Sequence, residues 1–180
     1  GTVTGVTPGT TTITYSLGSG CTQTMTMTVM PSPAAIAGSP NLCVGSSSSL
    51  TDATPGGTWS SSATGIATIT SGGLVGGAAA GTATISYSVG ACAAILPVTV
   101  NTTPSAIGGP TQVCVAASIT ATNGVAGGVW STTSPAISIG SSTGIVTGLS
   151  GGTGTITYAI GSCTVNRVVT VNGVTPITGP

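Results

Sequence analysis

The sequence predicts an all-β protein built from tandem β-sandwich domains, and three observations carry that prediction. First, four landmarks recur with an offset of 71 residues: Cys43, Trp59, Tyr87 and Cys92 are followed by Cys114, Trp130, Tyr158 and Cys163. Second, apolar residues alternate with Thr and Ser at period two, which is typical of half-buried strands. Third, Gly, Pro and Asn turn signals separate short apolar runs every 8–12 residues or so, which indicates about seven strands per repeat.

The repeat frame also gives the domain organisation. Residues 1–31 match only the second half of a repeat, because Tyr15 and Cys21 align with Tyr87 and Cys92. We expect this half to be completed by a preceding repeat or by a neighbouring subunit, since a lone hairpin is marginally stable. Complete domains are expected at 32–103 and 104–173, and the first strand of a following repeat at 174–180. Short Pro-containing joints between the units predict a stiff rod.

Each unit closes with a hairpin. In the half-repeat it covers 10–30, with Tyr15 among the inward residues and the turn at 18–20. The same hairpin is expected at 82–100 and 153–171. The Thr-rich face of the first hairpin is expected to be solvated, with ice binding as the alternative.

The first half of each complete repeat holds shorter strands. They lie around Leu42-Cys-Val44, Ser49-Leu-Thr51, Trp59, Ile66-Ala-Thr-Ile69 and Gly73-Leu-Val75, and again around Val113-Cys-Val115, Ser118-Ile-Thr120, Trp130, Ile137-Ser-Ile139 and Gly144-Ile-Val-Thr147. No segment is expected to form a helix.

The composition excludes several classes of function. Asp52 is the one acidic residue and Arg167 the one basic residue, and the chain contains no Lys, Glu or His. General acid–base catalysis needs positioned titratable groups, so we expect no enzyme, no cofactor and no metal site. Nucleic-acid binding needs Lys and Arg on phosphates and is not expected either. No apolar run approaches the roughly 20 residues of a membrane helix.

The cysteines are evenly spaced within the repeats. Cys43 and Cys92 enclose the same length of chain as Cys114 and Cys163, and we expect two intradomain disulfides in an oxidising compartment. Zinc is a weaker alternative, because the chain has no CxxC and no His. Cys21 is expected to pair with a cysteine of the missing half-repeat.

Three polar residues invite local interpretations. Asp52 aligns with Asn123 before a turn, and both are expected to cap it. Arg167 aligns with Leu96 on an inward face, so either a bulge turns it outward or it lies at a domain or subunit contact. Asn101 begins a single Asn-Thr-Thr sequon in an exposed joint and is a possible glycosylation site.

Several motifs carry a family resemblance. Trp59-Ser-Ser-Ser, Ile66-Ala-Thr-Ile69, Gly81-Thr-Ala-Thr-Ile85 and Gly144-Ile-Val-Thr-Gly148 resemble bacterial Ig-like group 2 repeats, and the whole chain resembles the Cys-containing arrays of secreted Bacteroidetes-type surface proteins. The resemblance implies seven-stranded Ig-like sandwiches, core positions for Trp59 and Trp130, and no catalytic residues. Tyr87 precedes Cys92 by five residues instead of the two of antibody domains, so the disulfide is expected near one end of the sandwich.

The sequence therefore predicts a structural segment or subunit of an extracellular, pilus-like filament or stalk. Its partners would be other copies or repeats of itself, with glycans possible on Ser and Thr, because a chain of near-zero net charge tends to associate. A covalent array and strand donation between separate subunits both remain open. The alternative function is an adhesin module that binds carbohydrate or a surface receptor.

Overall fold

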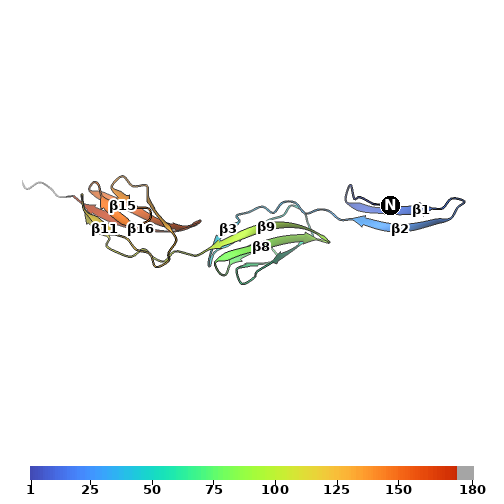
Figure 1. The fold of residues 1–180 in the computed structure, drawn as a ribbon, viewed down its shortest axis with the longest axis horizontal. Helices are drawn as coiled ribbons and strands as arrows, with labels where there is room; N and C mark the ends of the chain where they lie inside the picture. The colour runs from blue at the N-terminus through green and yellow to red at the C-terminus, as the bar shows by residue number, and fades with distance from the viewer. Residues whose placement is uncertain (174–180) are drawn as a thin grey trace, which may run out of the picture.

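The protein is described by a computed structural model that places residues 1–173, and every regular element among them is a β-strand. A hairpin, a middle domain and a C-terminal domain follow one another along a line (Figure 1). The all-β, Ig-like sandwich expected from the sequence is confirmed for the two domains. The strand expected at 174–180 lies outside the described residues.

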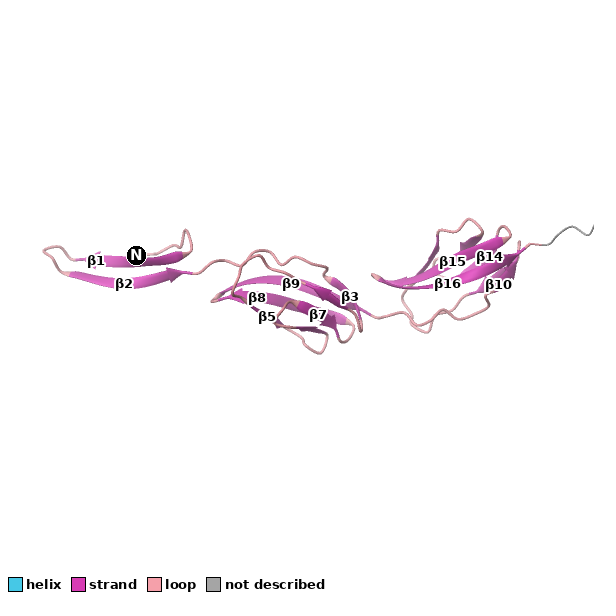
Figure 2. Cartoon of the chain, turned by 180° about the vertical axis from the view of Figure 1, so that it is seen from behind, coloured by secondary structure: helices cyan, strands magenta, loops and turns pink. Residues whose placement is uncertain are grey.

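The N-terminal hairpin consists of β1 (Gly9–Ser16) and β2 (Thr22–Val29). The strands pair antiparallel without interruption from Gly9 opposite Val29 to Ser16 opposite Thr22. No third strand pairs with them among residues 1–173, and the hairpin lies apart from the sandwich that follows (Figure 2).

The middle domain contains two packed sheets. The four-stranded sheet has the order β3-β9-β8-β5, with β3 (Asn41–Cys43), β9 (Cys92–Asn101), β8 (Gly81–Val89) and β5 (Thr58–Ser61). The three-stranded sheet has the order β4-β7-β6, with β4 (Ser47–Ser49), β7 (Leu74–Gly77) and β6 (Ala67–Ile69).

The C-terminal domain repeats this topology strand for strand. Its four-stranded sheet is β10-β16-β15-β12, with β10 (Gln112–Cys114), β16 (Cys163–Asn172), β15 (Gly152–Ile160) and β12 (Val129–Thr132). Its three-stranded sheet is β11-β14-β13, with β11 (Ser118–Thr120), β14 (Ile145–Gly148) and β13 (Ile137–Ile139).

The first and last strands of each domain run parallel, and this pairing decides which residues share an end of the sandwich. Cys43 is opposite Asn101 at the end of β9, and Cys114 is opposite Asn172 at the end of β16. The β8–β9 and β15–β16 turns, which immediately precede Cys92 and Cys163, lie at the other end.

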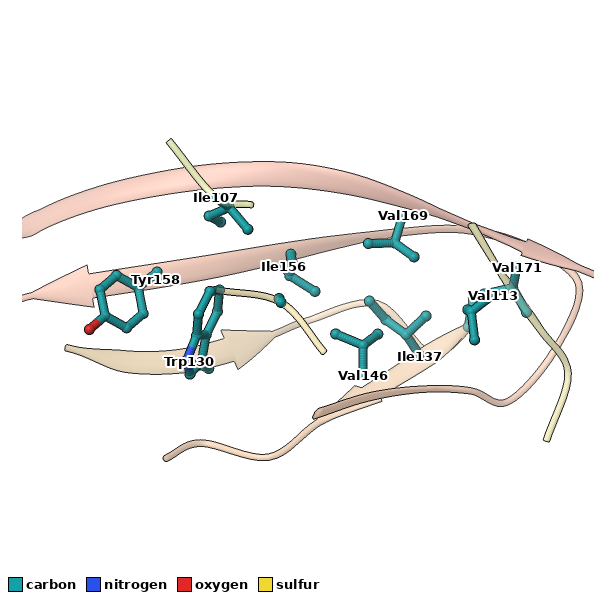
Figure 3. Close-up of a cluster of buried hydrophobic side chains, with 11 residues drawn as sticks. Ile107, Val113, Trp130, Ile137, Val146, Ile156, Tyr158, Val169 and Val171 are labelled. Carbon is teal, nitrogen blue, oxygen red and sulfur yellow. The ribbon is translucent and has the colours of Figure 1, made fainter. Parts of the chain in front are cut away.

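Each domain has its own apolar core between the sheets. In the C-terminal domain the inward residues of both sheets meet around Ile156, Val146 and Val169, which are 0–1% exposed (Figure 3). The middle domain places Ile85, Val75 and Val98 at the equivalent positions. The alternation of apolar and hydroxyl residues therefore marks an inner and an outer face, as strand geometry requires.

A tyrosine and a tryptophan pack together near the turn end of each core. The ring centroids of Trp59 and Tyr87 are 4.7 Å apart, and those of Trp130 and Tyr158 are 4.5 Å apart. The Tyr87 hydroxyl accepts a hydrogen bond from the Gly57 amide at 2.9 Å and donates one to the Thr54 carbonyl at 2.7 Å.

We expect Tyr87→Phe to destabilise the middle domain by about 2 kcal/mol, because it leaves a half-buried amide and carbonyl without partners. Chemical denaturation would measure the loss. Tyr15→Phe is the matched control, because Tyr15 is 67% exposed and loss of its hydroxyl should not change the free energy of unfolding. Equal effects of the two substitutions would contradict this interpretation.

Candidate functional site

The chemically distinctive site is the junction between the two complete domains, where a disulfide joins them. Cys43 of β3 is bonded to Cys163 of β16, with a Cα–Cα distance of 5.7 Å and a sequence separation of 120 residues. The expected intradomain pairs Cys43–Cys92 and Cys114–Cys163 are therefore wrong. Cys21, Cys92 and Cys114 are unpaired in this chain, as had been expected for Cys21 alone.

Strand register explains the correction. Cys92 begins β9 and Cys43 lies opposite Asn101 at the end of the same strand. A strand rises about 3.4 Å per residue, so nine residues separate the two cysteines by roughly 30 Å. A disulfide tolerates a Cα–Cα distance of at most about 7 Å. Stacking of the domains instead brings the β15–β16 turn of one domain against the end of β3 in the other.

Polar contacts surround the disulfide. The Asn101 Nδ2 lies 3.5 Å from the Leu42 carbonyl, and the Thr103 hydroxyl donates to the Val44 carbonyl at 2.8 Å. These bonds tie the exit of β9 to the residues on either side of Cys43. Cys163 itself is 2% exposed, so the junction covers its half of the disulfide almost completely.

Asn101 does not lie in an exposed joint, as the sequence suggested. It is the last residue of β9, and its side chain packs against the tip of the β15–β16 turn, where a Cβ on Gly161 would lie 2.6 Å from the Asn101 Oδ1. A glycan on this amide would occupy the space of the neighbouring turn. The junction therefore disfavours glycosylation of Asn101.

Gly161 allows this close approach, with φ of +57° and no side chain. We expect Gly161→Ala to lower the equilibrium fraction of the Cys43–Cys163 disulfide in a glutathione buffer by several-fold, since an L-residue in this conformation costs about 1–2 kcal/mol and displaces Asn101. Gly90→Ala is the matched control: Gly90 has φ of +59° in the equivalent turn, where Cys92 is unpaired. A similar shift from both substitutions would contradict a specific role of Gly161.

Asp52 and its counterpart Asn123 cap turns, as expected, and also anchor the chain just after each joint. The Asp52 Oδ1 accepts hydrogen bonds from the amides of Thr54 at 2.8 Å and Ala34 at 3.3 Å. The Asn123 Nδ2 donates to the Ser105 carbonyl at 2.6 Å. The bonds to Ala34 and Ser105 could not be predicted from the sequence, because each links residues that are 18 positions apart.

We expect Asp52→Asn to stabilise the middle domain by about 1–2 kcal/mol. Asp52 Oδ2 is buried and has no hydrogen-bond partner, whereas the amide nitrogen of Asn123 fills the equivalent position and donates to the chain. Thermal unfolding of Asp52→Asn and of the reciprocal Asn123→Asp should show opposite shifts. Destabilisation by both would contradict the proposed geometry.

The bulge expected at Arg167 is not found, and its bond in this chain lies within one domain, while a contact of Arg167 with another subunit stays a prediction. The β15–β16 register is continuous through Ile156 opposite Arg167, so no bulge turns the side chain outward. Its Nη1 instead donates a hydrogen bond of 2.7 Å to the Ile107 carbonyl of the same domain. Arg167 lies at the inward position that Leu96 occupies in the middle domain, and its long aliphatic stem carries the guanidinium to the Ile107 carbonyl.

The hairpin presents an uncovered inner face. Tyr15 and Met25 are 67% and 58% exposed, whereas Tyr87 and Tyr158 are 7% and 5% exposed in the complete domains. Trp130 is buried and Trp59 is half-buried, so both occupy core positions, while Tyr15 occupies one that has no cover here. The described residues include no helix long and apolar enough to cross a membrane.

No protein-family model and no curated protein matches the sequence. Among solved structures, domains 4 and 5 of the S-layer protein SbsC are 21% identical, with a TM-score of 0.40 over 78% of this chain and 99% of that chain. A C-terminal fragment of intimin, solved with the intimin-binding domain of its translocated receptor, is 19% identical, with a TM-score of 0.40 over 91% and 57%. Extracellular domains 3–5 of Drosophila OTK are 12% identical, with a TM-score of 0.40 over 93% and 72%. These identities and scores transfer no function.

Proposed function

We propose that this chain is a structural segment of an extracellular filament or stalk in which Ig-like domains follow one another head to tail. One observation carries the proposal: two successive domains are joined end to end by a covalent bond between cysteines of different repeats. A disulfide in this position fixes how neighbouring domains are placed relative to each other, whereas an intradomain disulfide would stabilise one domain alone. Head-to-tail contacts of identical units produce open, extending assemblies.

The charge and the cysteines support the same proposal. The formal net charge is zero, which favours association over a free soluble monomer. Disulfides persist in oxidising compartments, which places the assembly outside the cytoplasm in this proposal. Asp52 and Arg167 both bond to backbone groups, in different domains, so we assign the chain no catalytic role.

The exposed apolar face of the hairpin requires a covering partner in the proposed filament. Its apolar residues occupy positions that strands β3–β7 cover in the middle domain. We infer that the occupant of this face is the first half of another repeat, either within one longer polypeptide or donated by a neighbouring subunit. β-strand addition of this kind supplies main-chain hydrogen bonds and apolar pockets together.

Mass analysis of native material under denaturing, reducing conditions, which break disulfides between repeats, tests the proposal together with electron microscopy of the same preparation. Filaments and a mass many times 16.8 kDa would support a covalent array. Filaments that dissolve into units near this mass in denaturant would support strand donation. Discrete, non-filamentous particles at native concentration would overturn the structural role.

The adhesin alternative makes a different demand on the surface. Carbohydrate and receptor sites usually rely on accessible aromatic or charged residues. Here each Trp packs on a Tyr within its domain, and Tyr15 occupies a position that is buried in both complete copies. Selective binding on a glycan array would favour the adhesin alternative.

A further inference from the structure

We propose that the Cys43–Cys163 bond is one member of a repeating series, so that Cys114 and Cys92 form the same bond with the repeats on either side. The rule is that the first-strand cysteine of one domain bonds to the cysteine after the hairpin turn of the next domain. This inference rests on the proposed filament, because it requires neighbouring repeats.

Cys114 has the same structural position as Cys43. It lies opposite Asn172 in a parallel pair, as Cys43 lies opposite Asn101. The following residue also repeats its bond, because the Val115 amide donates to the Asn172 carbonyl at 3.1 Å and the Val44 amide to the Asn101 carbonyl at 3.0 Å. Cys114 and Asn172 are exposed, so the surface that receives a following hairpin turn is formed and open.

Cys92 has the same structural position as Cys163. Each is the first residue of the last strand and pairs with the last residue of the preceding strand, Val89 or Ile160. Cys92 is half-buried, whereas the bonded Cys163 is 2% exposed. The difference is the one expected when a first-strand cysteine and its surroundings are missing.

Near Cys92, one contact of the Cys43–Cys163 junction has an equivalent within this chain. A Cβ on Gly90 would lie 2.9 Å from the Met30 sulfur, and a Cβ on Gly161 would lie 2.6 Å from the Asn101 Oδ1. Met30 and Asn101 are 71 residues apart, as are the two glycines. The residue that follows β2 therefore contacts the β8–β9 turn at the place where the last residue of β9 contacts the β15–β16 turn. This second contact supports a junction geometry that recurs with the repeat.

Formation of each bond is a balanced oxidation. Two thiols lose two protons and two electrons, and one S–S bond forms. The electrons pass by thiol–disulfide exchange to a donor disulfide, which is reduced to two thiols. By the same rule, Cys21 would bond to the first-strand cysteine of the domain that precedes its own domain.

The series has a mechanical consequence. Each bond spans 120 residues, and two repeats of 71 residues contain 142. The covalent path along the filament therefore needs about 22 residues per pair of domains: the last strand of one domain, the joint and the entry to the next. Their extended length is roughly 75 Å, close to that of two stacked domains whose last strands each span about 34 Å. Such a filament resists extension even when its domains unfold.

Disulfide mapping of native filaments tests the inference. Free thiols are alkylated in denaturant without reduction, the protein is digested with a protease of broad specificity, and linked peptides are sequenced by mass spectrometry. We expect Cys114 to be linked to a cysteine that follows a hairpin turn, and Cys92 to be linked to a first-strand cysteine. Alkylation of both in intact filaments, or a Cys43–Cys92 pair, would overturn the series while leaving the filament proposal standing.

A variant adds an independent readout. In filaments that carry Cys114→Ser, one new alkylated thiol is expected, on the cysteine after the following hairpin turn. Cys43→Ser is the matched control and should expose Cys163 instead. The absence of a new thiol in Cys114→Ser would overturn the inference. If the unsubstituted protein formed no filaments, the proposed function itself would be contradicted. Electron microscopy of the same sample distinguishes this outcome from failure of the disulfide series.

Discussion

Pulled between its two ends, the oxidised chain should lengthen by about 400 Å less than the reduced chain when both domains unfold. Tension enters the middle domain, reaches Cys43 and passes through the disulfide to Cys163. The residues between these cysteines are thereby shielded from load, whatever their folded state. The bond spans 120 residues, and an extended chain covers roughly 3.3–3.6 Å per residue.

Single-molecule force spectroscopy on the full chain measures this difference directly as contour length. Cys43→Ser should restore the long extension without any reductant. Cys114→Ser is the matched control, because Cys114 has no partner in this chain, and it should keep the short extension. If the oxidised chain and Cys43→Ser released the same length, the disulfide would not carry the load.

The same bond also links the stabilities of the two domains. In the chain-entropy model, a closed loop of this size lowers the unfolded-state entropy enough to stabilise the folded pair by about 5 kcal/mol. An intradomain bond would have stabilised each sandwich separately. The observed connection instead penalises the unfolding of both domains together, as the joints of the proposed filament would require.

The strands and the repeat could be predicted from the sequence because both depend on local patterns. Period-two alternation places Ile85 and Tyr87 inward, and the 71-residue offset repeats every landmark. The burial of Trp130 in the four-stranded sheet opposite Tyr158 follows from the same patterns. These features need no knowledge of how one domain meets the next.

The disulfide could not be predicted in the same way, because equal spacing is compatible with two connections. Cysteines 49 positions apart in every repeat can bond within a repeat or between successive repeats. The parallel pairing of β3 with β9 decides between them, since it places Cys43 at the end of the domain that is remote from Cys92. Arg167 shows a similar limit: alternation placed it inward, but only the three-dimensional path of the chain brings the Ile107 carbonyl within 2.7 Å.

Backbone amides of the first hairpin should exchange at least about a thousandfold faster than those of its two copies in the complete domains. Amides of β1 and β2 are expected to exchange fast, because an isolated two-stranded hairpin is marginally stable in water. Amides of β8–β9 and β15–β16 require unfolding of a domain, which costs at least about 5 kcal/mol in typical proteins. The three hairpins have related sequences and similar registers, so each complete domain is an internal control for the first.

Exchange followed by mass spectrometry on the purified chain and on native filaments distinguishes intrinsic from acquired protection. In filaments, β1 and β2 should become as protected as β8 and β9, because strands of another repeat cover Tyr15 and Met25. Slow exchange of β1 and β2 in the purified monomer would contradict the idea that this face needs a partner. Fast exchange that persists in filaments would contradict completion of the hairpin, and the exposed apolar face would then require a different explanation.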